Sequence, residues 1–371
     1  MIKRKKILIL CPYALQRAPG QRFRFEQYVQ CLEENGCDVI IAPFLSSHAH
    51  TFLYKSKYFL RKSLAVLQGY CGRLKLLFSI RKFDYVFIYR EAAPLGPPVF
   101  EYLVFLIGKT VVYDFDDAIF LPRASKANKI TMFLKCAWKV SYISARANRV
   151  SVCNPYLVSW VTAKNDNVTL LPTTVDLAYH IPNDAKKSVV GRKIVVGWTG
   201  SHSTVAYLQI VQDAIVQLSK EFDFEFLVIC DVDPELLGVK NCRYIPWRLE
   251  SEISDLNQID IGLMPVPDGE WELGKVGFKA IQYSAVGAVS VVSDTGSGNE
   301  VVEHGKTGFV ISNTTEAWKT SIQYLLENPQ CVEKMSREAR TYIDRKYSVR
   351  VNTPVFLSLF DITQAPSEAT S

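Results

Sequence analysis

Residues 270–294 read EWELGKVGFKAIQYSAVGAVSVVSD, and the interpretation of the whole chain starts from this stretch. Its middle predicts a short helix that begins near Gly274. Its end, from Ala288 to Val292, is a β-branched run typical of a buried parallel strand. The stretch is therefore predicted to form a helix that leads into an interior strand.

Three polar side chains share one face of this predicted helix. Lys275, Lys279 and Gln282 are spaced i, i+4 and i+7, and the other helical positions are small or apolar. Two ammonium groups, an amide and the helix N-terminus can together bind an anionic, hydroxylated ligand. The alternative is the solvated face of an ordinary surface helix, because such polar stripes are common.

The charge of the chain is distributed unevenly along its length. The 371 residues are 48% hydrophobic, which is enough to build the cores of two domains. The formal net charge is +6, but residues 1–180 carry +13 and the remaining residues carry −7. A basic N-terminal half predicts a surface that faces an anionic partner.

Two long stretches concentrate the positive charge. Residues 39–83 and 118–165 contain many Lys and Arg but no Asp or Glu, and both include large apolar residues such as Phe59 and Trp138. Basic amphipathic helices of this kind suit an anionic membrane surface. Nucleic acid is the competing partner, and helices that merely cover a sheet are a third interpretation. Because no nucleic-acid-binding motif is present, we predict a membrane partner and no nucleic acid.

Cysteine usage and the apolar segments indicate the cellular location of the protein. Nine cysteines without a C-x-x-C pair predict reduced thiols, and they favour neither a disulfide framework nor a zinc site. The first ten residues, MIKRKKILIL, are typical of a first strand and not of a signal peptide. The most apolar segment, Val99–Ile107, contains Glu101 and is too short to span a bilayer. The predicted location is cytoplasmic and peripheral, on the inner face of the cytoplasmic membrane.

Alternating strand and helix patterns predict two β/α domains. The chain opens with a strand at 6–11, a helix at 22–34 and a second strand at 37–44, which is the start of a doubly wound sheet. A second sheet begins near residue 194, after the polar segment Asn183–Arg192. The predicted domains are residues 1–185 and 186–350, followed by a C-terminal segment and tail at 351–371. A cleft between two such domains is a common ligand site.

Charged residues in the N-terminal half lie where α/β folds place their sites. The loop after the first strand lacks G-x-G-x-x-G, but Arg22 and Arg24 follow it. Asp116 and Asp117 lie just beyond the strand at 110–113, at its carboxyl end. A helix cap or a solvated turn is the alternative for these carboxylates. A metal site is disfavoured because no histidine lies nearby in the sequence.

Several motifs together resemble glycosyltransferase family 4, the retaining sugar-nucleotide enzymes with the GT-B fold. The resemblance covers about residues 5–350 and points to a bacterial surface-polysaccharide type. The matching segments are YDFDDA at 113–118, LPTTVD at 171–176, GWTGS at 197–201, GKVGFKAIQYSAVG at 274–287 and GKTGF at 305–309. The resemblance implies two Rossmann-like domains facing a cleft, with the acceptor on the first and the nucleotide-sugar donor on the second.

The chain departs from the commoner family pattern at the residues expected to contact the diphosphate of the nucleotide-sugar donor. The family has two glutamates eight residues apart, where this chain has Gly274 and Gln282, and the loop at 200–204 lacks the usual Arg and Lys. Lys275 and Lys279 are therefore predicted to neutralise the diphosphate and to stabilise its developing charge. No metal or other cofactor is expected.

The resemblance also implies roles for the remaining site residues. Gln282 would bind the ribose hydroxyls, and Glu272 or Glu270 would hold the donor sugar. The predicted catalytic set is Asp116, Asp117, Lys275 and Glu272. The predicted donor-binding set is Gly200, Ser201, Trp247, Lys275, Lys279, Gln282 and Glu300, with the first two acting through backbone N–H groups. Arg22 and Arg24 are the predicted acceptor-binding residues.

The sequence thus predicts a retaining glycosyltransferase. It would move a sugar from a nucleotide-sugar donor to a saccharide or lipid-linked saccharide acceptor in cell-surface polysaccharide biosynthesis. One alternative is a sugar-nucleotide epimerase of the same fold. Another is a protein that binds a nucleotide or sugar without turnover, which the missing glutamate pair favours.

Overall fold

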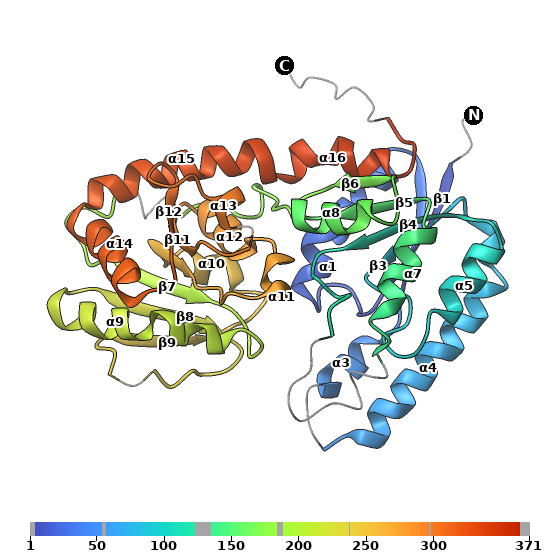
Figure 1. Ribbon diagram of the computed structural model, residues 1–371, viewed down its shortest axis with the longest axis horizontal. Helices are drawn as coiled ribbons and strands as arrows, with labels where there is room; N and C mark the ends of the chain where they lie inside the picture. The colour runs from blue at the N-terminus through green and yellow to red at the C-terminus, as the bar shows by residue number, and fades with distance from the viewer. Residues whose placement is uncertain are drawn as a thin grey trace. The chain divides into compact units, whose positions relative to one another are not determined.

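The computed structural model describes residues 4–53, 57–122, 135–183, 188–236, 238–296 and 298–363. The chain folds into two compact units (Figure 1). Unit 1 consists of Met1–Thr173 and Asn352–Ser371, and unit 2 consists of Thr174–Val351. Each unit is a parallel sheet covered by helices, as the sequence predicts for two β/α domains.

Unit 1 is built on a six-stranded parallel sheet. Its order is β2-β1-β3-β4-β5-β6, so the strand order reverses between β1 and β3, where open α/β sheets place their ligands. The strands are β1 (Lys5–Cys11), β2 (Cys37–Pro43), β3 (Tyr85–Tyr89), β4 (Thr110–Phe115), β5 (Arg149–Val152) and β6 (Val168–Leu170).

The helices of unit 1 lie close to the predicted positions, with one break. The predicted helix at 22–34 starts earlier, with a proline in its first turn, and a 3₁₀ turn at Glu26–Tyr28 divides it in two. The helices are α1 (Pro19–Arg24), α2 (Val29–Glu34), α3 (Ser47–Leu53), α4 (Phe59–Leu77), α5 (Val99–Leu106), α7 (Trp138–Arg146), α8 (Pro155–Thr162) and, from Asn352 onward, α16 (Val349–Ser358).

The C-terminal segment belongs to the core of unit 1. Phe356 of α16 stacks on Tyr28, with 4.4 Å between ring centroids, and Phe360 makes an edge contact with Tyr85 at 5.6 Å. Both phenylalanines are buried. The segment predicted as a separate C-terminal piece at 351–371 is therefore part of unit 1 as far as the structure describes it.

Unit 2 has its own six-stranded parallel sheet, in the order β12-β11-β10-β7-β8-β9. Because β7 is the first strand and lies beside β10, the strand order reverses between these two. The strands are β7 (Val195–Thr199), β8 (Glu225–Cys230), β9 (Cys242–Pro246), β10 (Ile261–Met264), β11 (Val289–Ser293) and β12 (Gly308–Ile311).

Helices cover both faces of the second sheet, which explains why its strands are apolar without alternation. Phe226 and Val228 of β8 pack with α9 and α14, whereas Leu227 and Ile229 pack with Tyr283 of α12. The helices are α9 (Gln209–Glu221), α10 (Glu252–Leu256), α11 (Glu270–Leu273), α12 (Phe278–Ala285), α13 (Gly298–Val301), α14 (Thr315–Glu327) and α15 (Pro329–Tyr347).

The single helix predicted from Gly274 is two helices in the structure. Helix α11 ends at Leu273 and α12 begins at Phe278, with a non-helical connection between them. Two glycines in this connection, Gly274 and Gly277, disfavour helix because glycine loses the most backbone freedom on folding. The predicted i, i+4, i+7 stripe is therefore corrected: only Lys279 and Gln282 share a helix.

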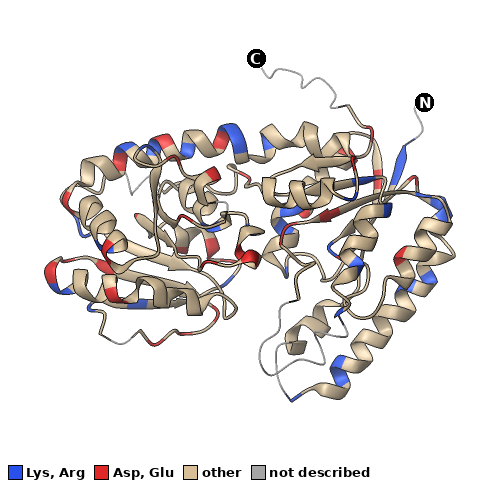
Figure 2. Cartoon of the chain, viewed as in Figure 1, with Lys and Arg blue, Asp and Glu red and all other residues tan. Residues whose placement is uncertain are grey.

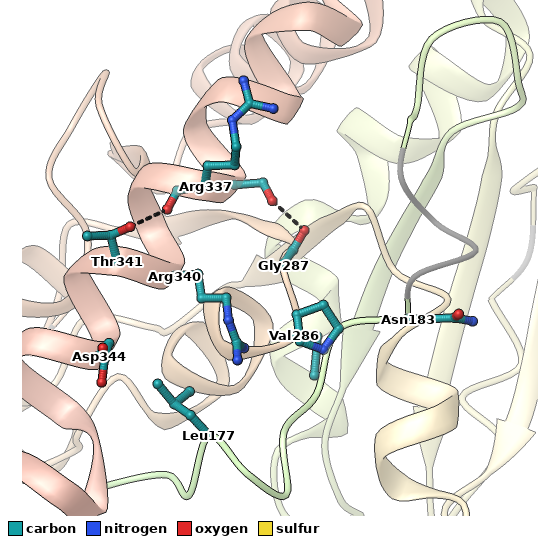
Figure 3. A pocket seen from close by; sticks show the side chains of 10 residues that line it. Leu177, Asn183, Val286, Gly287, Arg337, Arg340, Thr341 and Asp344 are labelled. Carbon is teal, nitrogen blue, oxygen red and sulfur yellow. Dashed lines mark hydrogen bonds between the residues drawn. The ribbon is translucent and has the colours of Figure 1, made fainter. Parts of the chain in front are cut away.

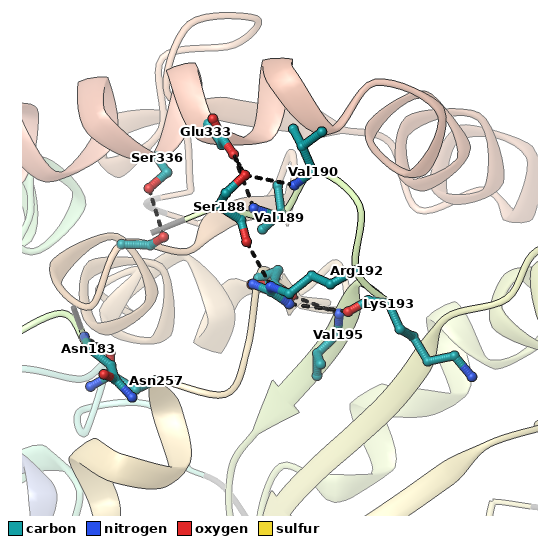
Figure 4. A network of polar contacts seen from close by, with 12 residues as sticks. Asn183, Ser188, Val189, Val190, Arg192, Lys193, Val195, Asn257, Glu333 and Ser336 are labelled. Carbon is teal, nitrogen blue, oxygen red and sulfur yellow. Dashed lines mark hydrogen bonds and ion pairs between the residues drawn. The ribbon is translucent and has the colours of Figure 1, made fainter. Parts of the chain in front are cut away.

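The described part of the segment predicted as the domain boundary, Asn183 and residues 188–192, is packed into unit 2 (Figure 4). Ser188 Oγ donates to the Glu333 carboxylate at 2.6 Å, and the Arg192 guanidinium pairs with both oxygens of Asp260 at 2.7 and 2.8 Å. The division between the units therefore falls at residues 173 and 174, and not at the predicted 185 and 186. Ser188 and Arg192 pair with residues of unit 2, whereas in a linker their side chains would be solvated.

Some predictions concern residues outside the described part of the chain. These are residues 54–56 and 123–134 of the two acid-free stretches, residues 184–187 of the predicted boundary segment, Ser297 of the predicted turn, and the tail at 365–371. Within the described ranges, every helix is too short or too polar to cross a bilayer.

Candidate functional site

Helix α12 is fixed to the point where the strand order of unit 2 reverses. The Tyr283 hydroxyl accepts the Thr199 N–H of β7 at 2.8 Å and donates to the Leu263 carbonyl of β10 at 3.2 Å. A side chain at Gly262 would overlap the Tyr283 ring. The start of α12 is thereby placed near the carboxyl ends of these strands, where α/β folds bind ligands.

Lys279 is an uncompensated cation in the first turn of α12. Its Nζ lies 5.6 Å from the centre of the Trp198 ring, and within the described residues it has no hydrogen-bond or ion-pair partner. Burial and the neighbouring Lys275 ammonium lower the pKa of Lys279 to about 8. Because a partly buried cation beside a like charge costs free energy, an anionic ligand at this position would be stabilising.

Tyr207 brings Lys275 and Glu272 to the same aromatic ring. The Tyr207 hydroxyl donates to Glu272 Oε1 at 2.7 Å, and Lys275 Nζ lies 5.7 Å from the ring centre. Glu272 is buried, and a Cβ at Gly269 would be only 2.5 Å from Glu272 Oε2. The carboxylate is therefore held in one orientation by a phenol that also contacts the ammonium.

The Trp198 indole brings the loop after β7 to the same place as Lys279. A side chain at Gly200 would overlap the Trp198 ring, so the loop backbone lies directly against it. However, the Gly200 N–H donates to the Ile229 carbonyl at 3.0 Å, and the Ser201 N–H donates to Thr204 Oγ1 at 3.3 Å. The two N–H groups predicted to bind a diphosphate are thus engaged inside unit 2.

Gln282 is available to a ligand in the next turn of α12. Gln282 is 6% exposed, and its side-chain amide makes no hydrogen bond within the described part of the chain. The amide is not among the fully buried polar groups that lack a partner, so it reaches solvent in the unliganded protein. A ligand bound beside Lys279 can therefore hydrogen-bond to it.

The other two predicted donor residues flank this region on separate elements. Glu300 of α13 follows β11, its side chain is exposed, and its carbonyl accepts from the Tyr342 and Tyr347 hydroxyls at 2.7 and 2.9 Å. Trp247 follows β9 and packs on the apolar cluster that contains Tyr283. Both residues follow carboxyl ends of strands, and no contact between described residues joins either side chain to Lys279.

A histidine–aspartate pair at the same sheet edge was not predicted. His202, after β7, and Asp231, after β8, lie 2.6 Å apart between Nδ1 and Oδ2, and the His202 N–H donates to Oδ1 at 2.5 Å. Burial alone would raise the pKa of Asp231, but the hydrogen bonds from His202 lower it. The signal in the sequence is that each residue closely follows one of two adjacent parallel strands.

The two predicted carboxylates of unit 1 are paired with Arg90. Arg90 directly follows β3 and donates to Asp116 at 2.7 Å and to Asp117 at 2.5 Å, and the Tyr89 hydroxyl donates to Asp116 at 2.9 Å. Burial raises the pKa of Asp116, but the Arg90 charge and its hydrogen bond outweigh burial and lower it. Asp116 is therefore ionised at neutral pH and suits a charge-stabilising role better than proton donation.

The loop after β1 lies against this carboxylate cluster. A side chain at Gly20 would overlap the Tyr89 hydroxyl and lie 2.9 Å from Asp116 Oδ2. Gly20 opens α1, so the loop between β1 and α1 comes to the carboxyl ends of β3 and β4. The cluster therefore lies at the point where the strand order of unit 1 reverses.

The two predicted acceptor-binding arginines have different surroundings. Arg24 is completely buried, where its guanidinium pairs with Asp114 and donates to the Leu171 carbonyl. Arg22 is partly exposed, and its guanidinium lies 4.8 Å from the centre of the Phe23 ring. The structure thus gives Arg24 a structural role that differs from the predicted one, and only Arg22 is accessible.

A cavity of about 730 Å³ lies at the opposite edge of the second sheet (Figure 3). Val286 and Gly287, which precede β11, line it, as does Arg340 of α15. Arg340 donates to the His180 carbonyl at 3.0 Å and to the Ala285 carbonyl. This cavity is at the amino ends of the strands and is therefore separate from the region around Lys279. Among the described residues, no cluster of three or more His, Cys, Asp or Glu side chains is suited to a metal ion.

Comparison with known proteins gives a family match for the central part of the chain. Residues 193–328 match the family described as glycosyl transferases group 1. This range runs from just before β7 to the end of α14 and includes Lys275, Lys279 and Gln282. No curated protein sequence matches the chain significantly.

Solved structures match nearly the whole chain. A glycosyltransferase from Rickettsia africae ESF-5 has a TM-score of 0.70 at 15% identity, covering 96% of this chain and 98% of that one. Sucrose-phosphate synthase from Thermosynechococcus elongatus has a TM-score of 0.70 at 13% identity, with the same coverage. Anabaena HepE in complex with UDP and glucose has a TM-score of 0.67 at 15% identity, covering 97% and 100%.

These matches define the class of protein. The structural similarity shows the GT-B fold, with two Rossmann-like domains. The group 1 domain shows that the chain is a glycosyltransferase, an enzyme that transfers a sugar.

Proposed function

We propose that this glycosyltransferase uses a nucleotide-sugar donor bound on unit 2 and transfers the sugar with retention to a saccharide or lipid-linked saccharide. We further propose a role in cell-surface polysaccharide biosynthesis. The observation that carries the proposal is Lys279, a partly buried ammonium group without an anionic partner among the described residues. The structurally similar HepE, which has been crystallised with UDP and with UDP-glucose, supports a nucleotide donor.

Lys275 and Lys279 would act on the leaving group. As the bond to the sugar breaks, negative charge accumulates on the nucleoside diphosphate, and fixed cations stabilise that charge most when water is excluded. The two ammonium groups repel each other in the unliganded protein, so the diphosphate relieves this repulsion on binding. Two lysines suffice to neutralise the diphosphate, and the proposal therefore includes no metal or cofactor.

Glu272 and Gln282 would position the two sugars of the donor. The Glu272 carboxylate, oriented by Tyr207, would accept hydrogen bonds from hydroxyls of the transferred sugar. The Gln282 amide can both donate and accept, which matches the paired hydroxyls of a ribose. Trp247 and Glu300 would complete the donor site from the loops on either side.

Asp116 and Asp117 of unit 1 would serve the acceptor side of the reaction. Arg90 keeps the Asp116 carboxylate ionised, so it can orient acceptor hydroxyls or stabilise positive charge that develops on the sugar. Arg22 would contribute a cation to the acceptor.

Replacing Asp116 by Asn should lower kcat while the affinity for the donor stays near that of the wild type. The substitution removes one negative charge but keeps the shape of the side chain. The measurement is kcat from steady-state turnover, with Kd for the donor from calorimetry. Tyr89→Phe, which removes only the hydroxyl that donates to Asp116, is the matched control and should have a smaller effect on kcat. Equal losses of donor affinity and kcat in Asp116→Asn would contradict the assignment.

The affinity for a nucleoside diphosphate should fall as the pH rises above about 8. In the free protein, the pKa of Lys279 is lowered to about 8, and a bound anion raises it because it favours the charged form. Binding therefore takes up protons near pH 8, whereas phosphate, with a second pKa of about 6, is already ionised. Calorimetry in buffers of different ionisation enthalpy measures this uptake. Affinity that is constant from about pH 7 to pH 9 would count against Lys279 as a ligand.

A screen of nucleotide sugars by thermal shift tests the proposed function. A donor present at about 100 times its Kd should stabilise the protein by about 2.7 kcal/mol. Release of nucleoside diphosphate should then require an acceptor, and NMR of the product should show the anomeric configuration of the donor. Release without an acceptor would favour an isomerase or a hydrolase, and stabilisation without any release would favour a binding protein.

A further inference from the structure

Helix α4 of unit 1 has two apolar faces, and only one is covered. On the covered face, a Cβ at Gly69 would lie 2.6 Å from the Phe44 ring, and Tyr70 makes an edge contact with the same ring at 5.2 Å. The other face carries a row of large apolar side chains that the described part of the protein leaves open. Leu60, Leu64, Leu67, Leu74 and Phe78 are 81, 56, 60, 55 and 91% exposed.

The spacing of these side chains makes one continuous stripe. Positions 60, 64, 67, 74 and 78, together with the exposed Cys71, alternate in steps of four and three, which places them along one side of a helix. At 1.5 Å per residue the stripe is about 27 Å long. Exposed apolar residues scattered singly need no explanation, but a contiguous row of this size marks an interaction surface.

The described charged residues of α4 and its flanks, from residue 57 to residue 83, are all basic. Lys57, Arg61 and Lys75 are exposed on or beside α4, and Arg81 and Lys82 are exposed just after it. Residues 39–83 contain no acid, and Figure 2 shows Lys and Arg but no Asp or Glu along α4. A second copy of this helix would bring like charges together. The partner must therefore be apolar and anionic at once.

Helices α5 and α7 of the same unit also expose large apolar side chains. Helix α5 lies beside α4 (Figure 1) and carries an exposed row of its own at Val99, Tyr102 and Leu106. Trp138 at the start of α7 is 57% exposed. Tyr and Trp favour the boundary between water and the apolar part of a bilayer, because each has an apolar ring with a polar atom.

We propose that the exposed face of α4 docks on an anionic lipid bilayer. The helix would lie in the plane of the headgroups, with its leucines and Phe78 in the acyl boundary and its basic residues on anionic headgroups. The inner leaflet of the cytoplasmic membrane has this chemistry. The inference does not depend on the donor site, since it concerns only where the enzyme is held.

Vesicle co-sedimentation tests the docking surface directly. The vesicles are phosphatidylcholine alone or phosphatidylcholine with phosphatidylglycerol, each over a salt series. The apolar variant Leu60→Ser/Leu67→Ser/Leu74→Ser should lower the partition coefficient about tenfold per leucine, at low and at high salt. The charge variant Lys75→Gln/Arg81→Gln/Lys82→Gln should lower it about fivefold per residue at low salt only, because salt screens these charges.

Controls separate the surface from the fold and from the donor site. Val190→Ser/Lys306→Gln changes exposed residues of unit 2 and should bind vesicles like the wild type. All variants should keep wild-type affinity for a nucleoside diphosphate. If the apolar triple variant does not fold, Phe78→Ser, which changes a side chain that is 91% exposed, tests the stripe by itself.

Binding that both triple variants retain would overturn the proposal, and three further results would each do the same. The first is equal binding to vesicles with and without phosphatidylglycerol. The second is displacement by single-stranded RNA with a steep dependence on salt, which indicates nucleic acid. The third is a dimer by light scattering that the apolar variant converts to a monomer, which would make the stripe an interface between two copies.

Discussion

Arg24→Met should lower the free energy of unfolding of unit 1 by about 3–5 kcal/mol. The Arg24 guanidinium and the Asp114 carboxylate form an ion pair in which the side chains are 0 and 1% exposed. Ser151 also donates to Asp114, and Arg24 donates to the Leu171 carbonyl. Removing the cation leaves a buried carboxylate without a counter-charge, and that is the costly step.

Chemical denaturation and hydrogen exchange in β4 measure this loss. A matched control is Arg4→Met, because Arg4 pairs with Asp38 while the two side chains are 54 and 48% exposed. Exposed pairs contribute about 0–1 kcal/mol, so this variant should be nearly neutral. The double variant Arg24→Met/Asp114→Leu should recover part of the stability, because no buried charge remains. A loss below 1 kcal/mol in Arg24→Met would show that the pair is not buried in solution.

Lys279→Met should weaken nucleoside diphosphate binding by roughly 10- to 150-fold, as expected for losing a charged hydrogen bond worth about 1.5–3 kcal/mol. The melting temperature should stay the same or rise, because the substitution removes a partly buried cation that lacks an anion in the unliganded protein. Loss of binding with unchanged or increased stability is the signature of a ligand site. If Lys279 instead supported the fold, the substitution would lower the melting temperature and leave the affinity for the nucleoside diphosphate unchanged.

Calorimetry and a thermal melt on the same preparations check both parts of this prediction. Lys306→Met is the control, because Lys306 is an exposed lysine of the same unit that pairs with Glu303. Lys306→Met should change neither the affinity for the nucleoside diphosphate nor the melting temperature. Wild-type affinity in Lys279→Met would show that the diphosphate binds elsewhere.

The sequence predicts the sheets well because buried parallel strands have a strong local signal. The runs at β1 and β11 are apolar on both faces, and both strands lie within one residue of their predicted positions. Periodicity does not resolve short helices around glycine, so the break between α11 and α12 was missed. Lys275 nevertheless lies close enough to lower the pKa of Lys279, with its ammonium beside the Tyr207 ring and that of Lys279 beside the Trp198 ring.

The sequence does not show which residues far apart in the chain pair with each other. The polarity around Ser188 predicts a linker, but the partner of this residue, Glu333, lies 145 residues away. The place of Arg24 after the first strand predicts a ligand contact, but its partner Asp114 lies 90 residues further along the chain. His202 and Asp231 meet only because β7 and β8 are adjacent in the sheet.

A crystal structure of the protein with a nucleoside diphosphate tests the central claim most directly. We expect phosphate oxygens within hydrogen-bond distance of Lys279 Nζ, at the carboxyl ends of β7 and β10, with the ribose hydroxyls on the Gln282 amide. Phosphate bound in the cavity beside Arg340, or at any other place that leaves Lys279 without an anion, would contradict it.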